Sequence, residues 1–161
     1  MKNLEMHQAW MDYAIAIAKE AGAAGEIPVG AVIVNSVGVA IATGVNRKER
    51  DQDPTAHAEI VAIREAARVL RDWHLNGCTL YVTLEPCPMC AGAILQARVS
   101  TLVYGADDPK AGAIRTVANL PDSPVSFHKL NAIAGIREQE CQELLRAWFE
   151  NHRGYLSSST P

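Results

Sequence analysis

The sequence predicts an α/β fold with a mixed β-sheet covered by helices on both faces. Two short apolar segments, residues 29–34 and 39–45, flank a turn at 35–38 and are typical of an antiparallel hairpin. After this hairpin, helical and strand patterns alternate along the chain, which favours a sheet packed between helices. The pattern leaves the order of the strands open.

The first element is a helix expected over residues 5–24, because apolar side chains recur there at helical spacing. Gly22 and Gly25 are expected to end it. Residues 29–34 form a nearly continuous apolar run, which is typical of a strand buried on both faces. The turn then leads into the second strand of the hairpin.

A polar, charged loop over residues 46–53 is expected to precede the second helix. Asp53 is the predicted N-cap of this helix and Pro54 its first residue, since aspartate is a favoured cap and proline suits the first turn. Apolar residues from Ile60 to Leu70 continue at helical spacing.

The second half of the chain continues the alternation. The expected elements are, in order, a strand at 79–84, a helix at 86–97, a strand at 101–104, a loop with short helical turns at 105–129, a last strand at 133–136 and a helix at 138–151. We expect a single domain over residues 1–155, followed by a flexible C-terminal tail at 156–161.

Bulk composition narrows the class of protein. The net charge of −3 and the pI near 5.9 argue against a broad basic surface for nucleic acid, although they allow a local patch. No apolar run is long enough to span a membrane, and the N-terminus lacks a signal-peptide layout, so we expect a soluble, cytoplasmic protein. The four cysteines are therefore expected to be thiols or metal ligands rather than disulfides.

Two short segments carry the residues that point to chemistry. His57 and Glu59 lie near a helix start, and Cys87 and Cys90 lie where a strand turns into a helix. Zn²⁺ prefers imidazole and thiolate ligands, and the Cys-x-x-Cys spacing lets both sulfurs face one metal. With His57 as third ligand, the fourth position stays open to water, which is typical of a catalytic site. The pattern predicts about one zinc ion per chain.

Glu59 follows His57 by two residues, and such positions do not share a helix face. Its carboxylate is therefore expected beside the metal-bound water, where it can take a proton and return it to a leaving amine. Two alternatives stay open: a redox pair, or a structural zinc site whose fourth ligand is Cys78, His74 or Cys141. The combination of both segments favours the catalytic site.

Longer segments around these motifs resemble the tRNA adenosine deaminase branch of the cytidine/deoxycytidylate deaminase superfamily. The matching segments are residues 25–32, 53–60, 79–92 and 103–106. The resemblance implies a three-layer α/β/α sandwich with a mixed five-stranded sheet, and a homodimer. It also implies zinc held by His57, Cys87 and Cys90, Glu59 as catalytic proton shuttle, and conversion of adenosine to inosine at the wobble position of a tRNA anticodon stem-loop.

The resemblance further implies contacts to the substrate. Asn46 matches a family position that hydrogen-bonds the base, Asp107 and Asp108 match the loop beside the substrate, and Phe149 matches a position that borders the RNA. Without the resemblance, turn geometry explains Asn46 and the two aspartates at least as well, and an aromatic at 149 is more often part of a core or interface.

One departure from the family concerns RNA affinity. Members often end in a basic tail, whereas residues 151–155 here are only weakly basic. The cations expected to form a modest patch are Lys48, Arg50, Lys110, Arg115 and Arg153. Two other functions stay open. One is a deaminase of free nucleobases or nucleosides such as guanine or cytosine. The other is a non-catalytic zinc subunit that binds RNA, against which the intact Glu59 argues.

Overall fold

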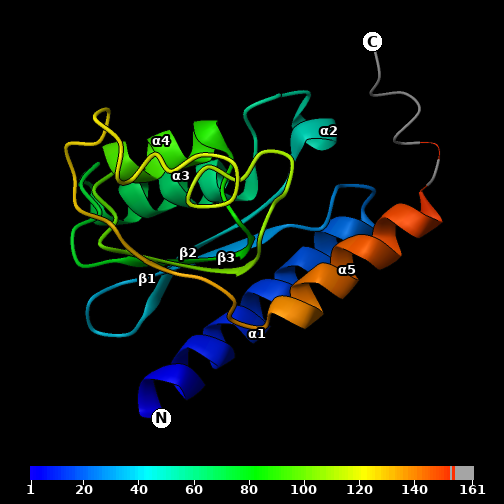
Figure 1. The fold of residues 1–161 in the computed structure, drawn as a ribbon, viewed down its shortest axis with the longest axis horizontal. Coiled ribbons are helices and arrows are strands. Elements are labelled where there is room, and N and C mark those ends of the chain that lie inside the picture. Colours follow the sequence, from blue (N-terminus) through cyan, green and yellow to red (C-terminus); the bar gives the residue numbers. More distant parts are fainter. Residues whose placement is uncertain (153, 155–161) are drawn as a thin grey trace.

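A five-stranded mixed sheet forms the middle layer of the computed structural model, which describes residues 1–152 and 154 (Figure 1). The strands are β1 (Gly30–Val34), β2 (Ala40–Val45), β3 (Thr79–Leu84), β4 (Thr101–Ala106) and β5 (Asn131–Ile133). Their order across the sheet is β2-β1-β3-β4-β5. β1 pairs antiparallel with β2 and β3, while β4 pairs parallel with β3 and β5. The predicted hairpin and mixed sheet are confirmed.

Helices form the two outer layers, as expected for a three-layer sandwich (Figure 1). The helices are α1 (Lys2–Ala23), α2 (Lys48–Asp51), α3 (Ala58–Leu70), α4 (Pro88–Gln96) and α5 (Glu138–Asn151). α3 and α4 pack on one face of the sheet, and α1 and α5 pack side by side on the other. α1 and α5 run in the same direction. Arg137, at the start of α5, pairs with Asp12 in the middle of α1, and the Trp148 indole N–H, near the end of α5, donates to the Gly22 carbonyl near the end of α1.

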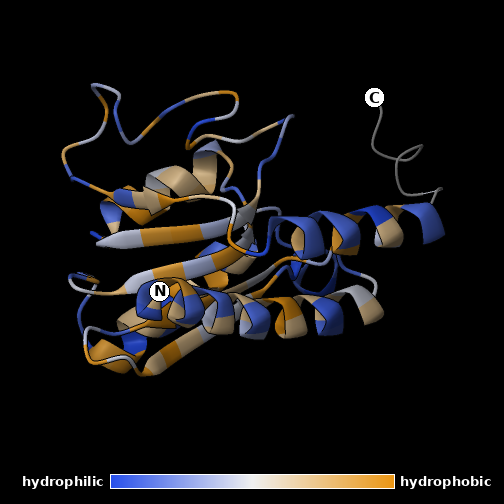
Figure 2. Cartoon of the chain, turned by 60° about the horizontal axis from the view of Figure 1, so that its bottom comes forward, coloured by the Kyte–Doolittle hydropathy of each residue, from blue (hydrophilic) through white to orange (hydrophobic). Residues whose placement is uncertain are grey.

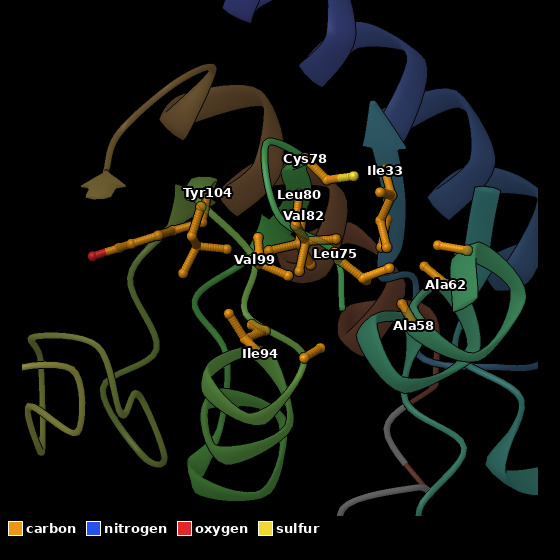
Figure 3. Close-up of a cluster of buried hydrophobic side chains, with 14 of the residues drawn as sticks. Ile33, Ala58, Ala62, Leu75, Cys78, Leu80, Val82, Ile94, Val99 and Tyr104 are labelled. Atoms are coloured by element: carbon orange, nitrogen blue, oxygen red, sulfur yellow. The ribbon is translucent and has the colours of Figure 1, made fainter. Parts of the chain in front are cut away.

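Apolar side chains fill the space on both sides of the sheet. In β1, Ile33 points into the cluster under α3 and α4, and Val32 points into the cluster under α1. All five residues of β1 are buried, which confirms the prediction of a strand buried on both faces. Figure 3 shows the α3–α4 side, where Leu80 and Val82 of β3 meet Ile94 of α4. Figure 2 shows the hydrophobic strands of the sheet between the two helical layers.

Two glycines allow helices to lie directly on the hairpin. A Cβ added at Gly30 would overlap the backbone of Ala14 in α1, and one added at Gly44 would overlap the backbone of Ala58 in α3. Ala58 is the first residue of α3, so this close approach places the start of that helix against β2. The position of His57 and Glu59 therefore depends on a backbone contact that only glycine permits.

The start of the second long helix was predicted wrongly. α3 begins at Ala58 with His57 as N-cap, and Asp53 and Pro54 lie in a turn before it. The Asp53 carboxylate accepts bonds from the Thr55 N–H at 2.8 Å and the Thr55 hydroxyl at 2.7 Å, so it closes a local turn instead of capping a helix. The predicted loop before it also contains the one-turn helix α2.

The last strand lies earlier than predicted. β5 ends at Ile133, and Gly135 adopts a φ of +82°, a conformation that interrupts an extended strand. The predicted helix at 138–151 matches α5, whereas the predicted tail at 156–161 lies outside the described residues. Within residues 1–152 and 154, no helix is both long and apolar enough to cross a membrane.

Candidate metal centre and active-site pocket

Three soft ligands converge where two helices begin. His57 is the N-cap of α3, Cys87 is the N-cap of α4, and Cys90 lies in the first turn of α4. The His57 Nδ1 lies 3.6 Å from the Cys87 sulfur and 3.5 Å from the Cys90 sulfur. One candidate ligand atom from each residue lies within 4.8 Å of the others. The structure thus brings together the three predicted zinc ligands.

Without a metal, local electrostatics favour the deprotonated form of Cys87 but not those of Cys90 and His57. The Cys90 thiol donates to the Cys87 sulfur, and with His57 this lowers the pKa of Cys87 to about 4 against the opposing effect of burial. The same bond and burial raise the pKa of Cys90. The hydrogen bond to Cys87 raises the pKa of His57. A thiolate at a helix N-terminus beside an imidazole and a second sulfur is a donor set that fits Zn²⁺.

The other candidate ligands lie elsewhere. Cys78 is buried in the core under α3 and α4 (Figure 3), and Cys141 is buried between α5 and the sheet. His74 bonds to the Asp72 carboxylate at 2.7 Å. Within residues 1–152 and 154, the group of His57, Cys87 and Cys90 therefore gains no fourth ligand from these side chains. This arrangement favours an open site over a four-ligand structural site.

Glu59 lies beside the three ligands on the first turn of α3. Its side chain is buried, with 4% of its surface exposed, and burial raises the pKa of its carboxyl. It lines the same cavity as His57 and Cys87. A buried carboxyl at this place can hold or release a proton next to a substrate.

The cavity above the ligands, called the active-site pocket here, has a volume of about 170 Å³. Its walls come from the segment before β1, the loop after β2, the start of α3 and the loops after β3 and β4. The lining residues are Ile27, Val29, Asn46, Lys48, His57, Ala58, Glu59, Leu84, Glu85, Cys87, Asp108 and Ala111. Apolar walls with a few convergent polar groups are typical of a small-molecule or base pocket.

The predicted substrate residues have different outcomes. Asn46 is buried in the pocket wall, where its amide donates weakly to the Ile27 carbonyl at 3.4 Å and accepts from the Lys48 N–H at 3.3 Å. Asp108 also lines the pocket, but its carboxylate accepts the N–H groups of Lys110 and Ala111, as a turn aspartate does. The structure therefore places both residues at the pocket while retaining the turn geometry.

Phe149 and Asp107 are not among the pocket residues. Phe149 lies on α5, on the opposite side of the sheet from α3 and α4, with its ring edge against Trp148. Asp107 forms a bidentate ion pair with Arg115. The structure does not bring Phe149 to the ligands, and its contact with RNA stays a prediction.

The predicted basic patch is partly neutralised. Lys48 lines the active-site pocket, whereas Arg50 lies near Asp51 and Arg115 pairs with Asp107. Lys110 is exposed in the loop that follows β4, and Arg153 lies outside the described residues.

Sequence reasoning missed a buried carboxylate in the pocket wall. Glu85 follows β3 and is 2% exposed. Hydrogen bonds from Arg115, Thr116 and Asp108 overcome the effect of burial and lower its pKa. A charged residue between a buried strand and the cysteine motif was the available signal, because buried carboxylates require partners.

Comparison with known proteins accounts for this arrangement of ligands. The family model for the cytidine and deoxycytidylate deaminase zinc-binding region matches residues 4–106. The chain belongs to this family. The His57–Glu59 segment and the cysteine motif both lie within the matched range.

Curated relatives match nearly the whole chain. A tRNA-specific adenosine deaminase of Bacillus subtilis is 45% identical over 91% of this chain and 90% of its own length. One of Haemophilus influenzae is 44% identical over 92% of this chain and 86% of its own length. These family members therefore match this deaminase over most of both chains.

Solved structures of the family have the same fold. One, from a study of A-to-I editing by tRNA deaminases at the wobble position, has a TM-score of 0.81 and 44% identity, and the match covers 84% of this chain and 97% of that one. A guanine deaminase of Nitrosomonas europaea has a TM-score of 0.74 and 27% identity, with 88% and 83% covered. The three-layer deaminase fold expected from the sequence is thus confirmed.

Proposed function

We propose that this deaminase hydrolyses adenosine to inosine at the wobble position of a tRNA anticodon stem-loop. The observation that carries the proposal is the cluster of His57, Cys87 and Cys90 beside a pocket that the buried Glu59 also lines. Relatives named tRNA-specific adenosine deaminases, similar over most of both chains, support this substrate. The absence of a long apolar helix in the described residues is compatible with the cytoplasm, where we expect the enzyme to act.

His57, Cys87 and Cys90 are the proposed zinc ligands. A bound zinc ion would supply a Lewis acid that makes water acidic enough to act as a nucleophile near neutral pH. The chain's own contribution begins with the thiol and imidazole groups, which it holds at two helix starts. The pocket walls bury Glu59 and partly bury His57 and Cys87, which limits their contact with bulk water.

Glu59 is the proposed proton carrier. Its carboxylate accepts a proton from the attacking water and then donates one to the exocyclic nitrogen of the base. The bond between that nitrogen and the ring carbon breaks and ammonia leaves. The second proton of the water ends on the ring nitrogen next to that carbon, so the carbon retains the oxygen as a carbonyl. One carboxylate can serve both transfers because attack and departure occur at the same ring carbon.

Asn46 is the proposed contact to the edge of the purine. An amide offers both a donor and an acceptor, so it can match the mixed pattern on that edge. Its present bonds to Ile27 and Lys48 are long, which leaves hydrogen-bonding capacity for a base. Asp108 is the proposed residue beside the substrate on the opposite wall of the pocket.

A homodimer is proposed through the outer face of α3 and α4. Large apolar side chains are exposed there: Trp73 at 57%, Leu70 at 39% and Met89 at 37%. A shallow hollow lies on the same face, and Trp73 is part of its lining. The hollow is lined by Ile63, Arg64, Ala67, Trp73, Ala93, Gln96 and Ala97. A contiguous apolar surface of this kind is typical of a protein interface, and the homodimer implied by the family resemblance makes a second copy the expected occupant.

The test of the proposed function is a substrate comparison on the zinc-loaded protein. Adenosine, guanine, cytidine and an anticodon stem-loop with adenosine at the wobble position are each incubated with it, and deaminated product is measured by mass spectrometry. We expect the stem-loop to react far faster than the free compounds. Faster turnover of guanine would instead support a free-base deaminase, an alternative kept open by the 27% identity to a guanine deaminase. Stem-loop binding without any product would support the non-catalytic subunit.

A further inference from the structure

The loop after β4 forms one wall of the active-site pocket without regular secondary structure. Residues 107–116 contain turns but no helix or strand, yet Asp108 and Ala111 line the pocket. A wall of this kind needs another source of order, because its backbone groups have no sheet or helix to join. Much of that order comes from one buried side chain, that of Glu85.

Glu85 accepts a set of hydrogen bonds that closes the loop around its carboxylate. Its Oε1 accepts the Asp108 N–H at 3.2 Å and the Thr116 hydroxyl. Its Oε2 accepts the N–H groups of Ile114 at 3.1 Å, Arg115 at 2.9 Å and Thr116 at 3.1 Å. An ionised carboxylate only accepts, so it can satisfy several backbone donors at once.

Glu85 is itself rigidly placed. Its backbone N–H donates to the Ala106 carbonyl at 2.8 Å, and the Ala113 N–H donates to the carbonyl of the next residue, Pro86, at 2.9 Å. The loop also lies so close that a Cβ at Gly112 would overlap the Glu85 carboxyl group. The carboxylate therefore fills the centre of the loop.

This arrangement joins the pocket wall to the metal centre. Glu85 lies two residues before Cys87 in the sequence, and its donors begin 23 residues later, at Asp108. Displacing the loop would move Asp108 and Ala111 relative to His57 and Glu59 across the pocket. The ligands on α3 and α4 would keep their own helices and sheet contacts.

We propose that Glu85 is a positioning residue: it orders the loop 108–116 as the substrate-binding wall of the pocket and acts on substrate affinity through that loop. The inference rests on the proposed function only for the identity of the substrate. The ordering of the loop can be measured without any substrate.

The first experiment is amide hydrogen exchange on the zinc-loaded protein, comparing the wild type with Glu85→Gln. The amide of glutamine keeps one acceptor and places an NH₂ group against backbone donors. We expect exchange in peptides covering 108–116 to rise at least about tenfold, as for the loss of a charged hydrogen bond, while peptides of β1 and β3 stay protected. Unchanged exchange in the loop would overturn the proposal, and so would an equal rise across the sheet.

A milder pair of variants guards against a failure of Glu85→Gln to fold. Thr116→Val removes one donor to Glu85 and keeps the shape of the side chain, whereas Thr116→Ser restores the hydroxyl. Thr116→Val should raise KM for the stem-loop several-fold, with kcat within about twofold and zinc content unchanged. Thr116→Ser should match the wild type, as should Glu5→Gln, an exposed glutamate on α1.

The outcomes separate the two proposals. A fall in kcat at unchanged KM in Thr116→Val, or no effect on either, would contradict a positioning role. If the wild type fails to deaminate the stem-loop, the proposed function is wrong, and the exchange experiment still decides whether Glu85 orders the loop.

Discussion

At the scale of single residues, the groups proposed to carry out the chemistry form two pairs, and the two members of each pair are close in sequence. His57 and Glu59 share the first turn of α3, and Cys87 and Cys90 share that of α4. Each pair therefore has its internal geometry set by one helix start. Four substitutions test the roles proposed for Glu59, the two cysteines and Asn46.

Glu59→Gln should lower the deamination rate by about 10²–10⁴-fold, the usual value of positioned general acid–base catalysis. Glutamine has nearly the same shape but cannot carry the proton. Zinc content and stem-loop affinity should stay the same, because Glu59 is not a proposed ligand or phosphate contact. Rate, metal analysis and binding are measured on one preparation. Loss of zinc would make Glu59 a ligand, and a normal rate would remove it from the mechanism.

Cys90→Ser should lower bound zinc from about one ion per chain to a small fraction, because a hydroxyl is a poor zinc ligand. Cys87→Ser should behave in the same way. Metal content after dialysis is the measurement. Cys78→Ala removes a buried thiol outside the site and should keep its zinc, so it controls for cysteine loss. Full occupancy in both serine variants would show that the ligands are elsewhere.

Asn46→Ala should reduce kcat/KM for the stem-loop by about tenfold or more, as expected for a lost hydrogen bond to a base, while zinc content is unchanged. Asn35→Ala is the matched control. Asn35 also lies at the end of a hairpin strand, where its side chain accepts the Val37 and Val39 N–H groups and serves only a turn. If both variants change stability alone, Asn46 is a turn residue as well.

At the scale of elements, the close contact between α3 and β2 holds half of the metal centre. Gly44 leaves no space for a Cβ beneath Ala58 and Ala62, and the helix start carries His57 and Glu59. By contrast, Gly92 on α4 has open space where a Cβ would be. An added methyl group should therefore disturb packing at Gly44 and leave it unchanged at Gly92.

Gly44→Ala should destabilise the fold by about 1–3 kcal/mol, the typical cost of overpacking, and should weaken zinc binding because the start of α3 must shift. Gly92→Ala should be neutral or stabilise by up to about 1 kcal/mol, since alanine favours the helix. Thermal unfolding and zinc titration measure both effects. Equal stability of the two variants would contradict the close approach of α3 to β2.

At the scale of the whole molecule, the helical layer of α3 and α4 exposes large apolar side chains on its outer surface. The exposed Trp73 stacks on His74 beside the hollow between α3 and α4, with a ring separation of 3.5 Å. Both zinc-bearing helices belong to this layer. An interface there would place the active-site pockets of two copies next to the shared surface.

Trp73→Glu should convert the proposed dimer to a monomer, because it places a charge in an apolar interface. Sedimentation velocity over a range of concentrations measures the change. Val37→Glu alters another exposed apolar residue, at the tip of the β1–β2 hairpin, and should leave the dimer intact. A wild type that sediments as a monomer at every concentration would contradict the proposed interface.

Much of the fold and the ligand set could be predicted because the signals are local. An apolar run predicts β1, a helical stripe predicts α5, and the Cys-x-x-Cys spacing places two sulfurs on one helix turn. Local signals also misled at Asp53, whose side chain could cap a helix or close a turn with Thr55. The choice between these two depends on where α3 begins, which its packing against the sheet determines.

By itself, the sequence determined the fold class, the candidate zinc ligands, Glu59 and the family to which they point. Only the tertiary structure decided the strand order, the packing of Gly44 against α3, the place of Phe149 outside the pocket lining and the hydrogen-bond partners of Glu85. The physical reason is separation along the chain. The donors to Glu85 lie 23 to 31 residues away, and no local spacing predicts which backbone groups a buried carboxylate will meet.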